Sequence, residues 1–341
     1  MCPLDAGWHA AGCIVRSPAQ IPIVICIDVE PDGFFIDRDR PLPWHGYERS
    51  IEFFRGLRAR AEAATGRPVH FNWFFRMDPQ IAETYGAAAW GIHFYARATA
   101  ELQACGDEIA LHVHPYRWRA EQHRWIVDQG SQSWVDHCVE DSFQAFEGAL
   151  GRRCTAFRFG QHWMSNATAR MLDRLGVRYE LTLEPGLREE PVHHRGERST
   201  GVLPDYSGVP TVPYRPSLDD YRNADRSRHD GMWMIPISTA PVRPRWYRLW
   251  YYSLFLKTGI SPAWTAMASH DPVLFDRVVN EVLQRESDAY LALTLRTNAL
   301  SNARLARRVT ANFTALLDHP LAGRFAFATP EEALRILRPT C

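Results

Sequence analysis

Residues 21–32 have the sequence IPIVICIDVEPD, an apolar run that ends in acidic side chains. Most of the run is isoleucine and valine, which are branched at Cβ and favour strands. A short run that is apolar at nearly every position predicts a strand over residues 21–29 that is buried on both faces, as in a parallel sheet. Asp28 and Glu30 lie two positions apart at the carboxyl end of this strand, so we expect their side chains to point to the same side.

Further strands and helices alternate with this first strand along the chain. We expect strands at residues 68–75, 108–114, 156–159, 179–183, 232–237, 289–295 and 325–328, and helices at residues 50–64, 95–104, 135–150, 166–175, 310–317 and 330–337. Such alternation is typical of parallel βαβ units, which form α/β folds. About seven units in one run favour a barrel over an open sheet.

The length and composition fit one large soluble domain. The chain has 341 residues, of which 46% are apolar and 23% charged, a normal balance for a globular protein. Two segments interrupt the alternation: residues 185–231 are rich in Pro, Arg and Asp, and residues 241–264 are aromatic and basic. We therefore expect an N-terminal extension over residues 1–20 and a single barrel domain over residues 21–338, with loop insertions near these two segments.

Charge and cysteine content exclude several classes of function. The 39 basic side chains are balanced by 39 acidic ones and form no long basic run, which argues against nucleic acid as a partner. The seven cysteines are scattered without a CxxC pair, so neither a thiolate zinc site nor a disulfide framework is indicated. The N-terminus lacks a signal-peptide pattern, and no apolar stretch approaches the roughly 20 residues of a membrane span. We expect a cytoplasmic protein.

A second pair of polar residues ends another predicted strand. In EIALHVH, residues 108–114, His112 and His114 again lie two positions apart. The carboxyl ends of the strands of a parallel barrel line its active face, so both pairs should meet there. A single histidine or aspartate at a strand end is more often a core residue or a helix cap. Two such pairs favour a divalent metal site, for Zn²⁺ first and for Fe²⁺, Co²⁺ or Mn²⁺ as alternatives.

These motifs resemble those of the polysaccharide-deacetylase superfamily, the NodB-like proteins of carbohydrate esterase family 4. The resemblance lies in ICIDVEPD (25–32), GDEIALHVHPY (106–116), AFRFGQHW (156–163) with LGVRYELTLEPG (175–186), and FAFATPEEAL (325–334). Residues 232–259 also resemble a segment of exosortase-associated members. The resemblance covers nearly the whole chain, marks it as a divergent member, and implies a distorted (β/α)7 barrel.

The resemblance also implies roles for particular residues. Asp28 matches the general base, and Glu30 matches the second acidic position, which binds the metal. His112 matches the first metal histidine. Arg158 matches the arginine that orients the base, and we expect its charge to keep Asp28 ionised by lowering the pKa of that carboxyl.

The sequence departs from the family pattern at three places. Tyr116 stands where the second metal histidine is expected, and His114 is the replacement that we infer. Gly160 and Gln161 replace a proline-tyrosine step. The family's last motif ends a strand with a histidine that acts as general acid, whereas this chain has Arg296 or Thr297 there.

Because arginine does not release its proton near neutral pH, the acid would have to come from elsewhere. We include His162 and Arg296 among the catalytic candidates, with His114 as a further possible acid. The candidates for substrate binding are Tyr116, Trp118, Gln161 and Trp163. For His162 and Trp163, packing of the loop onto the following helix is an equally good interpretation.

The resemblance implies a metal-dependent hydrolase of an amide bond that removes an N-acyl group from a sugar or glycan, or from another small N-acylated substrate. One alternative is a catalytically altered or inactive glycan-binding relative, in which Arg296 contacts a carboxylate or phosphate. Another is a hydrolase of a different bond, a cyclic amide or a glycoside, on the same fold. The aromatic segment at residues 246–255 fits a lid, a membrane-docking surface, an oligomer contact or an outer helix, and we leave a homo-oligomer open.

Overall fold

The computed structural model describes residues 19–33, 36–191, 199–241, 263–285 and 289–337. Most of the expected N-terminal extension and residues 242–262 of the second expected insertion, with the aromatic segment 246–255, lie outside the described residues.

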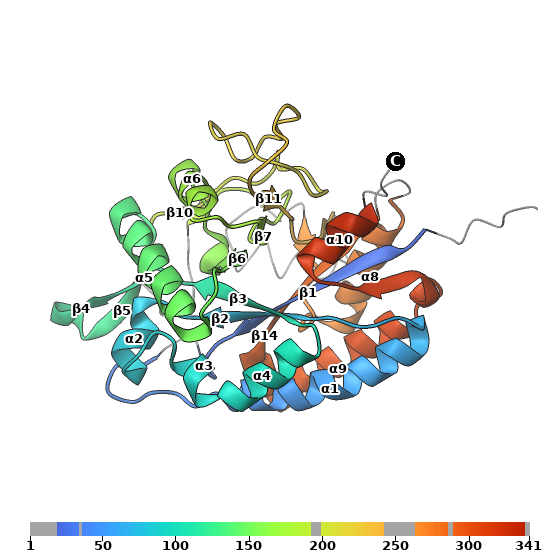
Figure 1. Cartoon of the computed structure of the whole chain (residues 1–341), viewed down its shortest axis with the longest axis horizontal. Helices are drawn as coiled ribbons and strands as arrows, with labels where there is room; N and C mark the ends of the chain where they lie inside the picture. Colours follow the sequence, from blue (N-terminus) through green and yellow to red (C-terminus); the bar gives the residue numbers. More distant parts are fainter. Residues whose placement is uncertain (1–18, 34–35, 192–198, 242–262, 286–288, 338–341) are drawn as a thin grey trace, which may run out of the picture.

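A curled parallel sheet forms the centre of the molecule (Figure 1). Its strands are β1 (Ile21–Val29), β2 (Asn72–Arg76), β3 (Glu108–Val113), β6 (Ala156–Phe159), β7 (Tyr179–Glu180), β11 (Trp233–Met234), β14 (Leu291–Arg296) and β15 (Phe325–Phe327). They are ordered β11-β7-β6-β3-β2-β1-β14, and β15 pairs with the beginning of β1. Every pair in this sheet is parallel, as the alternation of strands and helices predicts.

The two ends of the sheet meet through a few backbone contacts rather than a long ladder. After β11 the chain continues along β7, where Ile237 N–H donates to the Leu183 carbonyl at 2.7 Å. The next residue reaches β14: Ser238 N–H donates to the Ala292 carbonyl at 3.0 Å, and Ser238 Oγ accepts from Ala292 N–H at 2.9 Å. The seven strands of this path thus form a distorted α/β barrel, which confirms the predicted fold class.

Alternation along the strands divides their side chains between two cores. Ile23, Ile25 and Ile27 of β1 point outward and join the main core beneath the helices. The intervening positions point into the barrel, where Val24 and Cys26 pack with other small or apolar side chains from neighbouring strands. Above this apolar floor, toward the carboxyl ends of the strands, the inward series continues with polar residues. The barrel is therefore filled below and polar only at its mouth.

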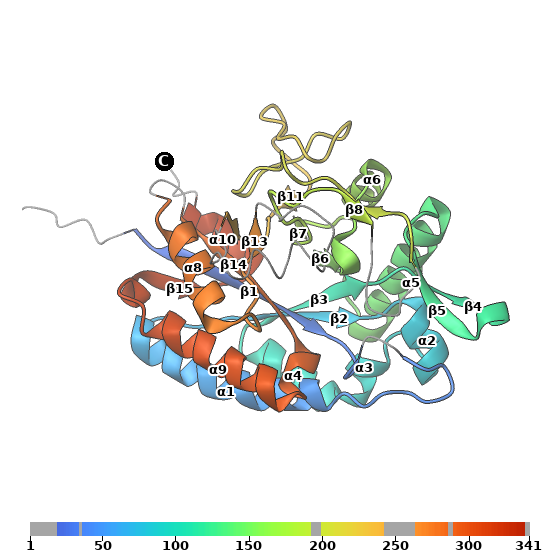
Figure 2. The ribbon, with the colours of Figure 1, turned by 180° about the vertical axis from the view of Figure 1, so that it is seen from behind.

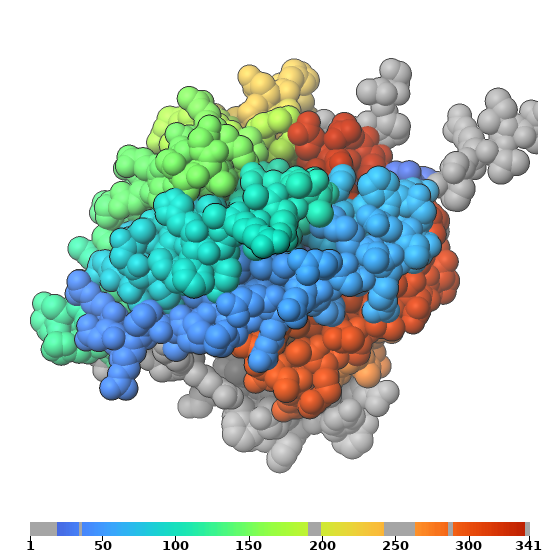
Figure 3. Space-filling model, turned by 60° about the horizontal axis from the view of Figure 1, so that its bottom comes forward, coloured from blue at the N-terminus to red at the C-terminus, as the bar shows by residue number. Residues whose placement is uncertain are grey.

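Helices cover the outside of the barrel (Figures 1 and 2). They are α1 (His45–Thr65), α2 (Pro79–Tyr85), α3 (Trp90–Phe94), α4 (Ala96–Ala104), α5 (Gln132–Leu150), α6 (Asn166–Arg174), α8 (Pro272–Leu283), α9 (Ala303–Leu317) and α10 (Pro330–Leu337), with short 3₁₀ turns η1 (Ala120–Gln122), η2 (Gly160–His162), η3 (Thr297–Leu300) and η4 (Ala322–Arg324). Figure 3 shows the face on which α1 runs beside α9. Of the helices within the described ranges, none is both long and apolar enough to cross a bilayer.

Smaller strands extend from the mouth of the barrel. β4 (Tyr116–Arg119) and β5 (Arg124–Asp128) form an antiparallel hairpin directly after β3, and β9 (Ser199–Thr200) adds to it in parallel. Two further antiparallel pairs lie within the described residues: β8 (Glu190–Pro191) with β10 (Val202–Leu203), and β12 (Thr239–Ala240) with β13 (Trp264–Thr265). The segment 185–231, expected to be a loop, therefore contains three short strands and pairs with the hairpin.

Candidate metal centre and active site

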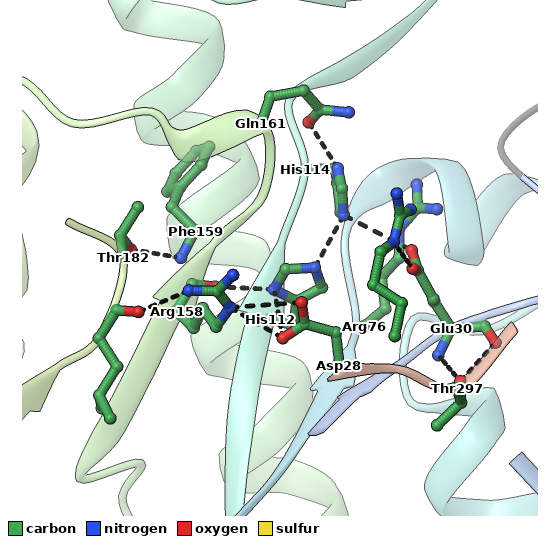
Figure 4. A network of polar contacts seen from close by, with 12 residues as sticks. Asp28, Glu30, Arg76, His112, His114, Arg158, Phe159, Gln161, Thr182 and Thr297 are labelled. Atoms are coloured by element: carbon green, nitrogen blue, oxygen red, sulfur yellow. Dashed lines mark hydrogen bonds and ion pairs between the residues drawn. The ribbon is translucent and has the colours of Figure 1, made fainter. Parts of the chain in front are cut away.

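Polar side chains from several strands converge at the mouth of the barrel (Figure 4). β1 carries Asp28 and is followed by Glu30, and β3 carries His112 and is followed by His114. β6 carries Arg158, which is paired with His112 in the register of the sheet. All five side chains are buried. The two pairs of residues that the sequence places at strand ends therefore do lie together.

Glu30, His112 and His114 form a compact group that could hold one ion. One ligand atom of each lies within 4.8 Å of those of the other two. The two Nε2 atoms of the histidines are 2.8 Å apart, and His114 Nε2 is 3.8 Å from Glu30 Oε2. The structure thus brings together the three predicted metal ligands, His114 included.

Hydrogen bonds on the far side of each ring identify the nitrogen that is free to bind a metal. His112 Nδ1 lies 3.0 Å from the Arg158 carbonyl, which can only accept, so Nδ1 carries the hydrogen and Nε2 has a lone pair. His114 Nδ1 lies 2.5 Å from Gln161 Oε1, which also can only accept, because the amide nitrogen of Gln161 is the atom that donates to the Tyr116 hydroxyl. Nδ1 of His114 therefore carries the hydrogen as well, and its Nε2 has a lone pair. Two lone pairs face each other beside a carboxylate, an arrangement that a borderline divalent cation would stabilise.

Burial also keeps both rings neutral, as metal ligation requires. It lowers the pKa of His112 to about 3, with Glu30 opposing this effect and Arg158 and Arg76 adding to it. Burial, followed by the charge of Arg76, lowers the pKa of His114 well below its ordinary value. The donor set therefore fits a Zn²⁺-type ion.

Arg158 holds Asp28 behind the three ligands. Its Nε donates to Asp28 Oδ1 at 2.9 Å, and its Nη1 donates to the Leu181 carbonyl at 2.7 Å. Burial nevertheless raises the pKa of Asp28 above its ordinary value, and the positive charges of Arg158 and Arg296 oppose this rise only in part. The expected lowering of that pKa by Arg158 is therefore wrong in its net direction, because desolvation of the carboxylate outweighs the ion pair.

Arg296 occupies the strand end where the resemblance places a histidine. It ends β14 in register with Asp28, and its Nε forms an ion pair with Glu30 Oε1. The other carboxylate oxygen, Oε2, faces His114. The adjacent Thr297 hydroxyl accepts from the Glu30 backbone N–H at 3.1 Å. Glu30 thus has one oxygen for Arg296 and one directed toward the imidazoles, which is compatible with ligation through a single oxygen.

The sequence interpretation missed Arg76, which ends β2 beside His112. Its Nε donates to Asp78 Oδ2 at 2.7 Å, and its guanidinium lies over the Tyr116 ring, 4.9 Å from the centroid. Asp78 also accepts from the His114 backbone N–H at 3.2 Å. Arg76 could have been found from its position at a strand end, but the strand was predicted to stop at residue 75.

Residues 160–162 form an unusual turn beside His114. A Cβ on Gly160 would lie 2.3 Å from the His114 ring, so only glycine allows this approach. Gln161 and His162 both have left-handed backbones, with φ of 49° and 53°. His162 turns toward Glu184, with Nδ1 2.6 Å from Oε1. Glu184 was not predicted, although it directly follows the strand expected at residues 179–183.

The four predicted substrate-binding residues lie in different surroundings. Tyr116 is buried, and its ring stacks on that of His114 with 5.5 Å between centroids. Gln161 bonds to His114, as described above. Trp118 is half-buried on the hairpin, where its ring packs edge-on against Trp125 at 5.4 Å. Trp163 is half-buried and packs against the main core. Their roles toward a substrate stay predictions.

Comparison with solved structures places this arrangement in a known fold. A protein from Parabacteroides distasonis, provisionally named a glycoside hydrolase/deacetylase, matches with a TM-score of 0.51 and 12% identity, over 93% of this chain and 72% of that chain. A protein provisionally named a polysaccharide deacetylase from Mycobacterium smegmatis has a TM-score of 0.46 and 12% identity, over 94% and 91% of the two chains. The PuuE allantoinase has the same TM-score and identity, over 98% and 97%.

No protein-family model matches the sequence, and comparison with curated proteins found no match. The likeness in structure shows the fold alone. The chain has the α/β barrel fold of the polysaccharide deacetylases, as a divergent example of it.

Proposed function

We propose that this protein is a metal-dependent hydrolase of a carbon–nitrogen bond that removes an N-acyl group from a sugar or glycan. One observation carries this proposal: two histidine Nε2 lone pairs face each other at 2.8 Å beside the Glu30 carboxylate, with a buried Asp28 behind them. Such a donor set is typical of a catalytic divalent metal with three protein ligands.

Different side chains of the site have different roles in the proposed hydrolysis. Glu30, His112 and His114 would hold the cation, preferentially Zn²⁺. When bound, such a cation polarises a carbonyl and makes a water molecule more acidic. Asp28 accepts the proton of the attacking water, because it is the carboxylate of the site that is not a metal ligand. Arg158 fixes the orientation of Asp28 and stabilises its ionised form.

A sugar is the substrate class that the surroundings of the site favour. Trp118 lies on the hairpin that continues β3 outward from the metal ligands, and it is partly exposed. A partly exposed aromatic ring offers apolar surface on which a sugar ring can stack. The fold likeness to deacetylases supports an N-acetyl group as the acyl group.

The proposal predicts that metal and activity depend on different residues. Wild-type protein should retain about one divalent ion per chain, measured by plasma mass spectrometry, and release acetate from N-acetylated chito-oligosaccharides. His112→Ala should lose both the ion and the activity, because it removes a ligand. Asp28→Asn should keep the ion and lose activity by at least about 100-fold, the usual contribution of a general base.

His123→Ala is the matched control, since this histidine lies on an exposed turn of the hairpin. It should leave both quantities at the wild-type level. Absence of acetate release from wild-type protein supplied in turn with Zn²⁺, Co²⁺, Mn²⁺ and Fe²⁺ would contradict the deacetylase function.

The ion pair between Arg296 and Glu30 favours a second candidate, a glycan-binding relative without catalysis. In this case the guanidinium would take the place of the metal as the partner of Glu30. Metal stoichiometry separates the two candidates: a hydrolase retains an ion that is lost in His112→Ala, whereas a binding protein of this kind binds glycan equally well after dialysis against a chelator.

A further inference from the structure

We propose that His162, held by the buried carboxylate of Glu184, is the proton donor to the leaving nitrogen. This inference rests on the proposed function and deepens it, because it assigns the group that protonates the leaving amine, a role that the proposed metal ligands do not fill. The three observations that support it are the lack of a proton donor among the described metal-ligand candidates and Arg296, the contact between the two side chains, and the constrained turn on which His162 lies.

Breaking an amide bond requires a proton for the departing amine, and the groups around the metal ligands do not supply one. Arg296 stands at the strand end that faces Asp28 in the register, but a guanidinium stays charged. His112 and His114 hold their hydrogens on Nδ1, directed away from the centre toward the Arg158 carbonyl and Gln161. Asp28 is assigned to the water. Within the described part of the mouth, the proton donor must therefore be sought beyond the ligands.

Glu184 and His162 form an acid–imidazole pair next to this centre. Glu184 follows β7 and is 2% exposed, whereas the His162 side chain is 31% exposed. Glu184 Oε1 lies 2.6 Å from His162 Nδ1, and its other oxygen accepts from the Thr265 hydroxyl. A carboxylate at Nδ1 stabilises the charged imidazole and leaves Nε2–H free, as in other carboxylate–histidine pairs.

The electrostatics of Glu184 agree with this geometry. Burial alone would raise the pKa of Glu184, but the charge of His162, the contact with it and the charge of Arg158 bring that pKa below its ordinary value. A buried carboxylate that stays ionised is a suitable partner for an imidazolium. Asn72 is also a buried polar residue of the barrel interior, but the side-chain hydrogen bonds described for it go to backbone carbonyls and to no titratable group.

The backbone turn links this pair to the metal ligands. Gly160 lets the chain pass against the His114 ring, Gln161 then bonds to His114, and His162 points to Glu184. Left-handed backbone at two successive residues other than glycine costs conformational energy and is found preferentially at functional sites. The Tyr206 hydroxyl holds the turn by donating to the His162 carbonyl at 2.5 Å.

The complete step leaves no proton unaccounted for. Asp28 removes one proton from water as the oxygen attacks the acyl carbon. The carbon–nitrogen bond then breaks, its electron pair stays on nitrogen, and nitrogen takes the Nε2 proton of the His162 imidazolium. The products are the carboxylic acid and the amine. The proton on Asp28 is released to solvent and His162 regains one from solvent, which restores both groups.

The dependence on the leaving group tests this assignment. An amine needs the proton, whereas p-nitrophenolate leaves without one. His162→Asn preserves the left-handed backbone, because asparagine adopts it readily. We expect kcat on an N-acetylated chito-oligosaccharide to fall at least about 100-fold, and kcat on p-nitrophenyl acetate to fall less than about 3-fold. Glu184→Gln should show the same selectivity with a smaller loss and with KM nearly unchanged.

His123→Asn is the matched control, because His123 also has a left-handed backbone, with φ of 44°, but lies on an exposed turn. It should not distinguish the two substrates. Equal losses on both substrates in His162→Asn, or no loss on either, would overturn the role of His162. Failure of the proposed function appears differently, as wild-type protein that hydrolyses neither substrate with any of the four metals.

Discussion

Two buried carboxylates at the mouth of the barrel, Asp28 and Glu184, acquire opposite properties from their partners. Burial raises the pKa of Asp28, although Arg158 is in contact with it. Glu184 is equally buried, but its pKa is lowered because His162, Arg158 and the Thr265 hydroxyl together outweigh desolvation. The charge state of each residue therefore depends on the number of partners that folding supplies, and this number cannot be read from the strand-end pattern.

Glu180 of β7 shows the effect of burial with few partners. Its Oε1 accepts from Thr182 N–H at 2.8 Å, while Oε2 has no partner among the described residues. Burial raises the pKa of Glu180 to about 8 from an ordinary 4.5, against hydrogen bonds from Thr182 and the charge of Arg158. The folded state thus keeps a proton that the unfolded state releases as the pH rises above 4.5, so stability should fall as the pH rises from about 5 to 8.

Glu180→Gln tests this linkage. The amide cannot ionise and retains an oxygen for Thr182, so the variant should lose less stability than wild type between pH 5.5 and 8. The difference should be a few kcal/mol, at about 1.4 kcal/mol for each unit of pKa shift. Urea unfolding at the two pH values measures it, with the exposed Glu121→Gln as control. An identical fall in stability in Glu180→Gln and wild type would contradict the raised pKa.

At the scale of elements, the sequence predicted best those with strong local signals. β1 begins and ends as predicted, because its apolar run is bounded by polar residues at the mouth. α6 begins at residue 166 as predicted, directly after Ser165, whose Oγ accepts from Thr168 N–H at 3.0 Å and caps the helix. β7 and β11 are shorter than predicted because they lie at the irregular side of the barrel, where pairing depends on contacts far apart in the sequence.

The β4–β5 hairpin and the turn at residues 160–162 could not be predicted from local pattern. In the hairpin, YRWR of β4 alternates but is only four residues long, RWIVD of β5 does not alternate, and the residues between them include none of the Gly, Pro, Asn or Asp that mark a hairpin turn. The left-handed turn depends on the approach of His114, a residue some 46 positions away (160 − 114). The convergence of Glu30, His112 and His114 could be predicted because each lies at a strand end, whereas Glu184 pairs with His162 only through this turn.

The hairpin gives a prediction at the same scale. Tyr116 and Trp118 share one face, opposite Val127 and Trp125 in the register. If Trp118 stacks on a sugar ring beyond the scissile bond, Trp118→Ala should raise KM for a chito-oligosaccharide by about 10-fold, equivalent to about 1.4 kcal/mol, and should leave KM for monomeric N-acetylglucosamine unchanged.

Trp90→Ala on α3 is the control, since this half-buried ring stacks on Phe94 at the outer surface. Steady-state kinetics on the two substrates measures both variants. Equal changes in KM for the oligosaccharide and the monomer in Trp118→Ala would exclude a role of this ring in binding a longer glycan.

At the scale of the whole molecule, the three proposed metal ligands come from strands that do not adjoin. Glu30 follows β1, whereas His112 and His114 belong to β3 and its end, and β2 lies between these strands in the sheet. The ion pair of Glu30 with Arg296 extends this network to β14, the strand at which the barrel closes. A cation held by Glu30, His112 and His114 would therefore link the end of β1 to the end of β3 across the intervening strand β2.

Such a cation should stabilise the folded protein measurably. The three ligands meet only in the folded state, so binding favours that state by about 2.7 kcal/mol at a free metal concentration 100 times the Kd. For a protein of this size we expect Zn²⁺ to raise Tm by about 4 °C relative to protein dialysed against a chelator, measured by calorimetry. His112→Ala should abolish the shift, and Asp28→Asn should retain it, because Asp28 is not a ligand. Equal shifts in wild type and His112→Ala would place the ion elsewhere, independently of whether the protein hydrolyses any substrate.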